Sequence, residues 1–156
     1  MNQKTGRGFE IAKGFEDKGI KIPVRSTKNA AGYDIEAAED TIIPPYQFGM
    51  KPTLVKTGLK AYCEPDEFFI LANRSSGPFK KGLVMANSIG IIDSDYYGNE
   101  DNDGHFQCAY YNFFTEELEI KKGEAIAQVV FFNYLKTNED IESNEVRKGG
   151  FGSTDK

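Results

Sequence analysis

Apolar residues along this chain come in short runs, most of which alternate with polar residues, and turn-forming residues separate the runs. A period of two is typical of a half-buried β-strand, because successive side chains point to opposite faces of a sheet. Turn signals bound each run, which predicts roughly ten short strands in a barrel or sandwich and no βαβ repeat. The expected strands cover residues 9–11, 20–25, 31–38, 42–43, 54–62, 68–71, 106–114, 118–120 and 125–135.

A proline and a polar stretch indicate where an edge strand, a loop and a short helix lie. Pro23 marks the strand at 20–25 as an edge strand, because proline has no N–H to donate to a ladder. The polar stretch 73–78 predicts a loop, followed by one short helix around residues 79–82.

Residues 87–98 predict a tight β-hairpin. Gly90 would occupy the turn, because glycine adopts conformations that other residues resist, and residues 91–92 would lead out to Asp93. Unpaired backbone groups at the tip would be able to read the edge of a flat polar ligand, and Asp93 would be held, partly buried, at the strand end. Asparagine, glycine and aspartate are also common turn formers, so this stretch by itself favours an ordinary turn.

Length and composition predict one soluble domain over residues 1–156, with residues 1–7 as a loose N-terminal tail. No apolar run approaches the roughly 20 residues that cross a bilayer, and the N-terminus lacks the apolar segment of a secretory signal. The net charge is −5, without the dense Lys/Arg stripe that a nucleic-acid binder uses to neutralise phosphates. We therefore expect neither a membrane nor a nucleic acid as a direct partner.

Cysteine and histidine are scarce. Cys63 and Cys108 are too few for a disulfide framework and form no metal-binding spacing, which predicts two reduced thiols in a cytoplasmic protein. A lone histidine argues against a histidine-based triad or zinc site, and we expect His105 to be structural or solvated. The acidic stretch 98–104 lacks EF-hand spacing, which favours a solvated insertion.

Two further segments leave alternatives open. Gln128 interrupts an apolar strand, and because a buried amide needs hydrogen-bond partners it is either pinned to backbone or faces a ligand. Residues 137–156 predict a flexible, polar C-terminal arm that carries a glycine-rich motif. Its end is either a frayed terminus or a lid in which Phe151 stacks on a ring while Ser153, Thr154 and backbone N–H groups meet phosphate oxygens.

Five short segments follow one another in a fixed order along the chain. They are Ala31-Gly32-Tyr33-Asp34-Ile35, Arg74-Ser75-Ser76, residues 87–98, Gly123-Glu124-Ala125-Ile126-Ala127-Gln128 and Gly149-Gly150-Phe151-Gly152-Ser153-Thr154. In sequence and order they resemble the five motifs of the homotrimeric dUTP pyrophosphatase (dUTPase) family. The similarity runs from about residue 8 to the C-terminus, and the acidic insertion and short last motif resemble the Gram-positive bacterial and phage types.

The resemblance implies an all-β, jelly-roll-like barrel or sandwich with at most one short helix. It implies a homotrimer in which each active site draws on all three chains. The implied reaction converts dUTP and water to dUMP and pyrophosphate with Mg²⁺, which limits uracil incorporation into DNA and supplies dUMP. An alternative is a non-catalytic or dual-role protein on the same scaffold that binds a regulatory partner such as a phage repressor, through residues 99–104. A third possibility, dCTP deamination by a related fold, is disfavoured by the intact residues 93–96 and the glycine motif.

The resemblance also implies roles for individual residues. Asp93 would be the general base for the attacking water, Asn87 with the backbone of Gly90, Ile91 and Ile92 would read uracil, and Tyr96 would pack on deoxyribose. Asp34 would touch the metal through water or hold Arg74, and no direct protein ligand to the metal is expected. The residues expected on the phosphates and the base are Arg74, Ser75, Ser76, Gln128, Arg147, Phe151 (from a third chain), Gly152, Ser153 and Thr154.

Three positions depart from the family pattern. Ala125 stands where the fourth motif usually has arginine, so one cation near the site is missing, or Lys121 or Lys122 replaces it. Arg147 is one residue closer to Gly149 than in most members, and Asp155 adds a negative charge where glycine is usual.

Overall fold

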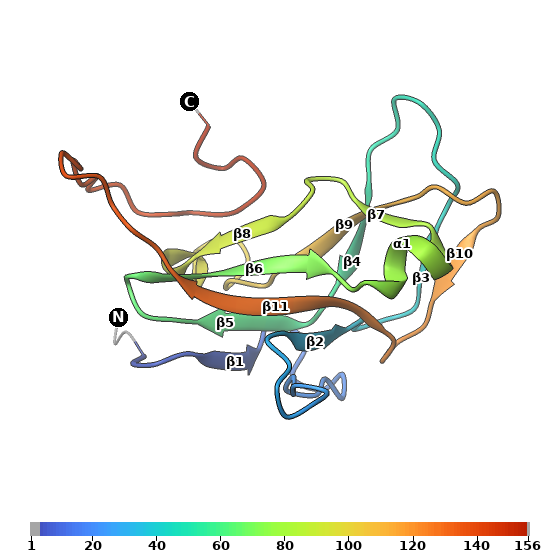
Figure 1. Cartoon of the computed structure of the whole chain (residues 1–156), viewed down its shortest axis with the longest axis horizontal. Coiled ribbons are helices and arrows are strands. Elements are labelled where there is room, and N and C mark those ends of the chain that lie inside the picture. Colours follow the sequence, from blue (N-terminus) through green and yellow to red (C-terminus); the bar gives the residue numbers. More distant parts are fainter. Residues whose placement is uncertain (1–3, 156) are drawn as a thin grey trace.

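The computed structural model describes residues 4–155, and this part of the chain is almost entirely β (Figure 1). It contains eleven strands, one α-helix and one 3₁₀ helix. The strands are β1 (Gly8–Ile11), β2 (Tyr33–Glu36), β3 (Thr41–Ile43), β4 (Thr53–Lys56), β5 (Leu59–Tyr62), β6 (Glu67–Asn73), β7 (Leu83–Met85), β8 (Gly90–Asp93), β9 (Gln107–Asn112), β10 (Leu118–Ile120) and β11 (Ala125–Asn133). The helices are α1 (Ser76–Lys81) and η1 (Ser94–Tyr96).

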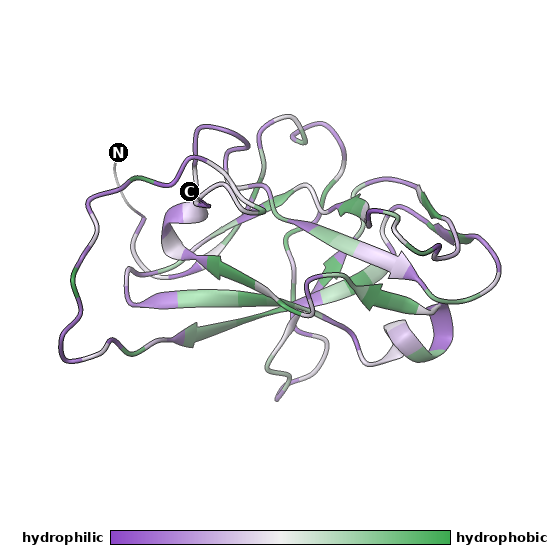
Figure 2. Cartoon of the chain, turned by 90° about the horizontal axis from the view of Figure 1, so that it is seen from above, coloured by the Kyte–Doolittle hydropathy of each residue, from purple (hydrophilic) through white to green (hydrophobic). Residues whose placement is uncertain are grey.

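Four antiparallel sheets enclose one core. The largest has the order β2-β11-β6-β8, the second has the order β4-β9-β7, and β1-β5 and β10-β3 form two-stranded ribbons. Hydrophobic residues concentrate on the strands, while the loops are mostly hydrophilic (Figure 2). Phe69 of β6 packs edge-on against Phe106 in this core, and the Tyr110 hydroxyl donates to the Ile126 carbonyl at 2.7 Å. The predicted all-β, jelly-roll-like class with one short helix is confirmed.

Several predicted boundaries change. The expected strand at 54–62 is two strands, because Gly58 has a φ of 69° and breaks the extended backbone. The predicted edge strand at 20–25 is wrong. Only Arg25 pairs, with Tyr33, and Pro23 removes a ladder donor from a segment whose Val24 stays exposed. The helix begins earlier than expected, at Ser76.

The predicted hairpin at 87–98 is also wrong. β7 pairs with β9 and β8 pairs with β6, so the intervening turn joins two different sheets. Ser88, with a φ of 66°, adopts the left-handed conformation that was expected of Gly90. Gly90 instead begins β8, where an added Cβ would lie 3.2 Å from Cβ of Leu71. Close strand packing therefore explains this glycine.

The acidic stretch is not a solvated insertion. Asn99 is buried, and its amide nitrogen donates to the Tyr96 carbonyl at 2.7 Å. Asp103 accepts from Nζ of Lys60 at 2.8 Å and from the backbone N–H of Lys13 at 3.0 Å. These bonds fasten the loop to η1, to β5 and to Lys13 near the N-terminus.

The histidine and the cysteines are structural, as expected. Nε2 of His105 accepts from the Gly58 N–H at 2.9 Å, and burial lowers the pKa of His105 to about 4. Cys63 and Cys108 are free and buried, and burial raises the pKa of these thiols to about 11 and about 12. Of the predicted N-terminal tail, residues 1–3 lie outside the described part, and Arg7 pairs with Glu67 at 2.5 Å.

Candidate active site

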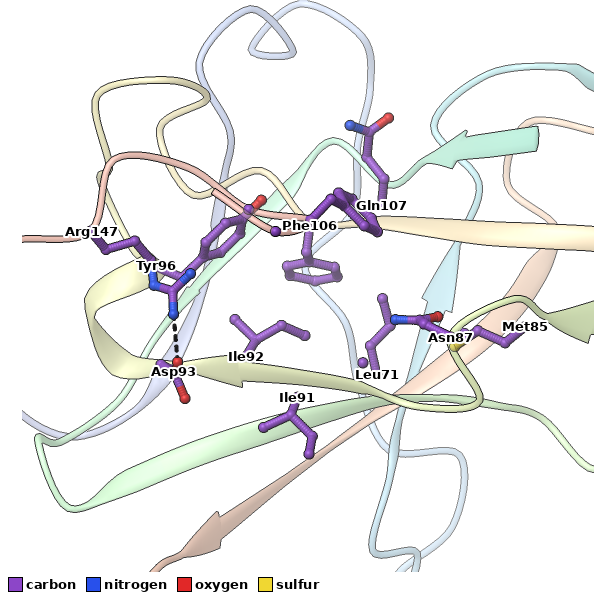
Figure 3. A pocket seen from close by; sticks show the side chains of 14 residues that line it. Leu71, Met85, Asn87, Ile91, Ile92, Asp93, Tyr96, Phe106, Gln107 and Arg147 are labelled. Atoms are coloured by element: carbon purple, nitrogen blue, oxygen red, sulfur yellow. Dashed lines mark hydrogen bonds and ion pairs between the residues drawn. The ribbon is translucent and has the colours of Figure 1, made fainter. Parts of the chain in front are cut away.

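A cavity of about 250 Å³ opens between β8, η1, the start of β9 and the C-terminal arm (Figure 3). Its apolar wall includes Leu71, Met85 and Phe106, and Ile92 projects from β8 on the same side as Phe106. Ile91 lies on the opposite side of the strand, as the period of two requires. The lining residues that the sequence predicted are Asn87, Gly90, Ile91, Ile92, Asp93, Tyr96, Arg147, Phe151 and Gly152.

Asp93 ends β8 at the mouth of this cavity. Its carboxylate is 54% exposed, and Oδ2 accepts a hydrogen bond from Nη2 of Arg147 at 2.6 Å (Figure 3). The acid therefore remains within reach of water and is held by a cation from the arm. Asp93 stands at a strand end, as expected, but its side chain is exposed where partial burial was predicted, and the strand belongs to no hairpin.

Tyr96 forms a fixed wall of the cavity. Its hydroxyl donates to the His105 carbonyl at 3.0 Å and accepts from Nδ2 of Asn102 at 2.7 Å. Burial raises the pKa of Tyr96, so the hydroxyl stays protonated. A Cβ added at Gly150 would lie 2.9 Å from the Tyr96 ring, so the arm approaches this ring as closely as glycine permits.

A second group of predicted residues surrounds the junction of β6, β11 and β2. Nε of Arg74 lies 3.2 Å from Oδ1 of Asp34, so Asp34 holds Arg74, one of the two alternatives expected for it. Nε2 of Gln128 donates to the Asn73 carbonyl at 3.1 Å, which pins this amide to backbone. Ser75 and Ser76 lie at the start of α1 beside Arg74.

A single chain does not bring the two groups together. In the β6–β8 ladder Asp93 lies opposite Phe68, while Arg74 follows the far end of β6 at Asn73. Six residue steps of extended chain separate Phe68 from Arg74, or roughly 20 Å. Ser153 and Thr154 are exposed and are not among the residues that line the cavity.

The departures from the family pattern have structural counterparts. Lys121 pairs with Glu119 at 2.5 Å, and Lys122 donates to the Lys18 carbonyl, so both candidate replacements for the missing arginine are engaged at the surface. Beside Ala125, Nζ of Lys81 lies 3.2 Å from Oε1 of Glu124, an ion pair that the sequence did not reveal.

Sequence reasoning missed several residues at the cavity. Leu71, Met85, Phe106 and Gln107 line it, and nothing distinguished their sequence positions from ordinary core or strand positions. Asp95, which contacts Arg147, was also missed, although its spacing of two residues from Asp93 was a usable signal.

Within residues 4–155, no three or more His, Cys, Asp or Glu side chains form a group that could hold a metal ion. The same part of the chain has no helix that is both long and apolar enough to cross a membrane.

The fold and the cavity define a class: a jelly-roll-like β protein whose pocket combines one exposed carboxylate, a fixed tyrosine and a covering arm. The family model described as dUTPase matches residues 18–155. A deoxyuridine 5'-triphosphate nucleotidohydrolase of Lactococcus lactis is 48% identical over 149 residues, covering 95% of this chain and 97% of the relative. A crystal structure of dUTPase from Streptococcus mutans has a TM-score of 0.77 and 40% identity, covering 84% of this chain and 98% of that chain.

The chain belongs to the dUTPase family, and the expected similarity to Gram-positive members is confirmed. The dUTPase of Staphylococcus bacteriophage 80alpha, solved with dUPNHPP, is similar in fold, with a TM-score of 0.66 and 24% identity over 96% of this chain and 98% of that one.

Proposed function

We propose that this protein is a dUTP diphosphatase that hydrolyses dUTP to dUMP and pyrophosphate. The observation that carries the proposal is one cavity lined by Asn87, Asp93, Tyr96 and Phe151, on a chain that belongs to the dUTPase family. Such an activity would limit uracil incorporation into DNA and supply dUMP. The free, buried thiols of the chain suit a reducing compartment, so we propose a cytoplasmic location.

The position of β8 supports base recognition by its backbone. β8 is an edge strand that pairs with β6 on one side, so its other edge has N–H and C=O groups outside the ladder. Together with the amide of Asn87 in the preceding turn, these groups would bind the polar edge of uracil. The deoxyribose would lie on the Tyr96 ring. The two hydrogen bonds of the Tyr96 hydroxyl would hold the ring in place, so that it could not move aside for a 2′-hydroxyl.

Asp93 would act as the general base. A carboxylate at the mouth of the cavity can accept a proton from a water molecule, and that water's oxygen would attack the innermost phosphorus in line. The bond from this phosphorus to the bridging oxygen breaks, and pyrophosphate leaves with that oxygen. Bound Mg²⁺ would supply charge neutralisation on the phosphates. We propose that the phosphate oxygens would hold the ion without a direct protein ligand, and that Asp34 holds Arg74 beside them.

The remaining phosphate contacts would come from other copies of the chain. We propose that Arg74, Ser75, Ser76 and Gln128 of one chain approach the cavity of another, because Arg74 is roughly 20 Å from Asp93 within one chain and none of the four lines the cavity. The chain folds its arm over its own cavity here, and the exchange of arms in a homotrimer remains our proposal. Leu135, two residues before the arm, is 97% exposed, which suits an apolar side chain that a second copy of the chain would cover.

An assay of pyrophosphate release from dUTP, dCTP, dTTP and UTP tests the proposed activity. We expect turnover of dUTP alone, dependent on added Mg²⁺. Turnover of dCTP to dUTP, or tight dUTP binding without product, would contradict it. Mass measurement in solution tests the trimer. We do not propose the alternative role as a binder of a regulatory protein, because the acidic loop assigned to it packs on Tyr96 and on the chain's own arm.

A further inference from the structure

Two carboxylates hold the arginine of the arm. Nε of Arg147 donates to Oδ1 of Asp95 at 3.0 Å, and Nη2 donates to Oδ2 of Asp93 at 2.6 Å. The third nitrogen, Nη1, donates to the Gly149 carbonyl at 3.2 Å, within the arm itself. The Arg147 side chain is only 20% exposed as a result, although it lies nine residues from the C-terminus.

Asp95 and Asp93 differ in their relation to the cavity. Asp93 lines it, whereas Asp95, two residues later on η1, does not. A nucleotide in the cavity would therefore compete with Asp93 for Arg147 and leave the contact with Asp95 intact. A guanidinium can keep one contact while it exchanges the other, because its planar fork presents hydrogen-bond donors on two edges at once.

We propose that Asp95 is a positioning residue for the reaction and acts through Arg147. It holds the Nε edge of the guanidinium while the Nη2 edge moves from Asp93 to the phosphates of the bound nucleotide. This movement frees Asp93 to accept the proton of the attacking water and places a cation on the charged substrate. The inference rests on the proposed function, and it deepens that function by assigning a residue outside the cavity. With the arms exchanged as proposed above, Asp93 and Asp95 would hold Arg147 of another copy through the same two hydrogen bonds.

The arm residues that follow Arg147 contact the same region of the chain as Asp95. The Asp101 N–H donates to the Lys148 carbonyl at 3.0 Å, and a Cβ added at Gly149 would lie 2.9 Å from Oδ2 of Asp101. Gly150 follows on the Tyr96 ring, and Phe151 then reaches the cavity. Because four successive arm residues contact residues 93–101, the anchor at Asp95 also sets where Phe151 lies.

Steady-state kinetics with dUTP test this role. We expect Asp95→Ala, and the isosteric Asp95→Asn, to lower kcat/KM about fivefold, the scale of a partly exposed ion pair. Asp95→Glu should restore part of the loss. Arg147→Ala should lower kcat/KM further, and the double variant Asp95→Ala/Arg147→Ala should equal Arg147→Ala alone. An equal Asp95→Ala effect with and without Arg147 overturns the proposal, as does no effect at all.

A second readout does not need turnover. The chain contains no tryptophan, so Phe151→Trp supplies a single fluorescent reporter on the arm. In that background Asp95→Ala should shift the emission of the free protein toward that of a solvated indole. Glu100→Gln, which removes one charge of the same loop, should leave the emission unchanged. An unshifted emission in Asp95→Ala overturns the inference, whereas a wild-type chain that releases no pyrophosphate from dUTP contradicts only the proposed function.

Discussion

Nη2 of Arg147 donates a hydrogen bond to Oδ2 of Asp93 at 2.6 Å, across 54 positions of sequence. The contact joins the arm to the residue proposed as the general base. In the free protein it neutralises a carboxylate that is 54% exposed at the cavity mouth. A substrate with several negative charges can displace this single hydrogen bond, because phosphate oxygens also accept charge-assisted hydrogen bonds from guanidinium.

Substitution of Asp93 tests its proposed role as the general base. Asp93→Asn keeps the size of the side chain and removes its ability to accept a proton. We expect kcat to fall by a factor on the order of 100 to 10,000, the usual contribution of a general base. Calorimetric titration with a non-hydrolysable dUTP analogue should show affinity within a few-fold of the wild type. Equal losses of binding and turnover would make Asp93 a mainly structural residue.

Removal of the arm tests its role as a cover. Deletion of residues 147–156 should reduce kcat/KM by more than tenfold, because Arg147 and Phe151 are lost together. The thermal midpoint should change little, since this segment forms no strand and the core lies elsewhere. Normal activity in the truncated chain would contradict a role for the arm in the reaction.

Tyr96 offers a test that separates stability from chemistry. Tyr96→Phe keeps the ring and removes a hydroxyl that bonds to the His105 carbonyl and to Asn102. Leaving these buried partners unsatisfied should cost about 1–3 kcal/mol in the free energy of unfolding, measured with urea. KM for dUTP should change less than threefold, because the ring remains. A large change in KM without a loss of stability would show that the hydroxyl contacts substrate.

His105 predicts a stability that depends on pH. Its pKa is about 4 in the folded chain because burial disfavours the charged form, against about 6.5 when unfolded. Below pH 6.5 the unfolded chain binds the extra proton first, so stability is lost as the pH falls through the window from about 6.5 to about 4. The loss from this group should approach about 3 kcal/mol.

Urea unfolding at several pH values measures this loss, and His105→Gln is the control. The variant should show a shallower decline between pH 6.5 and pH 4.5, because the carboxylates with lowered pKa, Glu10 and Glu67, lose their ion pairs mainly at lower pH. Identical pH profiles for the two proteins would show that His105 is not the group that titrates.

The sequence predicted the fold class correctly, but it predicted some strands correctly and others wrongly. The apolar run at 68–71, with turn-forming residues on both sides, was sufficient to find the middle of β6, which the structure extends to Glu67–Asn73. The hairpin at 87–98 was wrong because a local pattern cannot say which sheet accepts a strand. β8 pairs with β6 and β7 with β9, and both pairings join residues distant in the chain.

By itself the sequence determined the period of the strands, the turn positions and the five spaced motifs that indicate the dUTPase family, because these depend on local chemistry and order along the chain. Only the tertiary structure decided that Asp95 contacts Arg147, that the acidic loop is fastened to Tyr96, and that Arg74 lies far from Asp93. These relationships depend on long-range pairing, where a shift of one strand would change every contact.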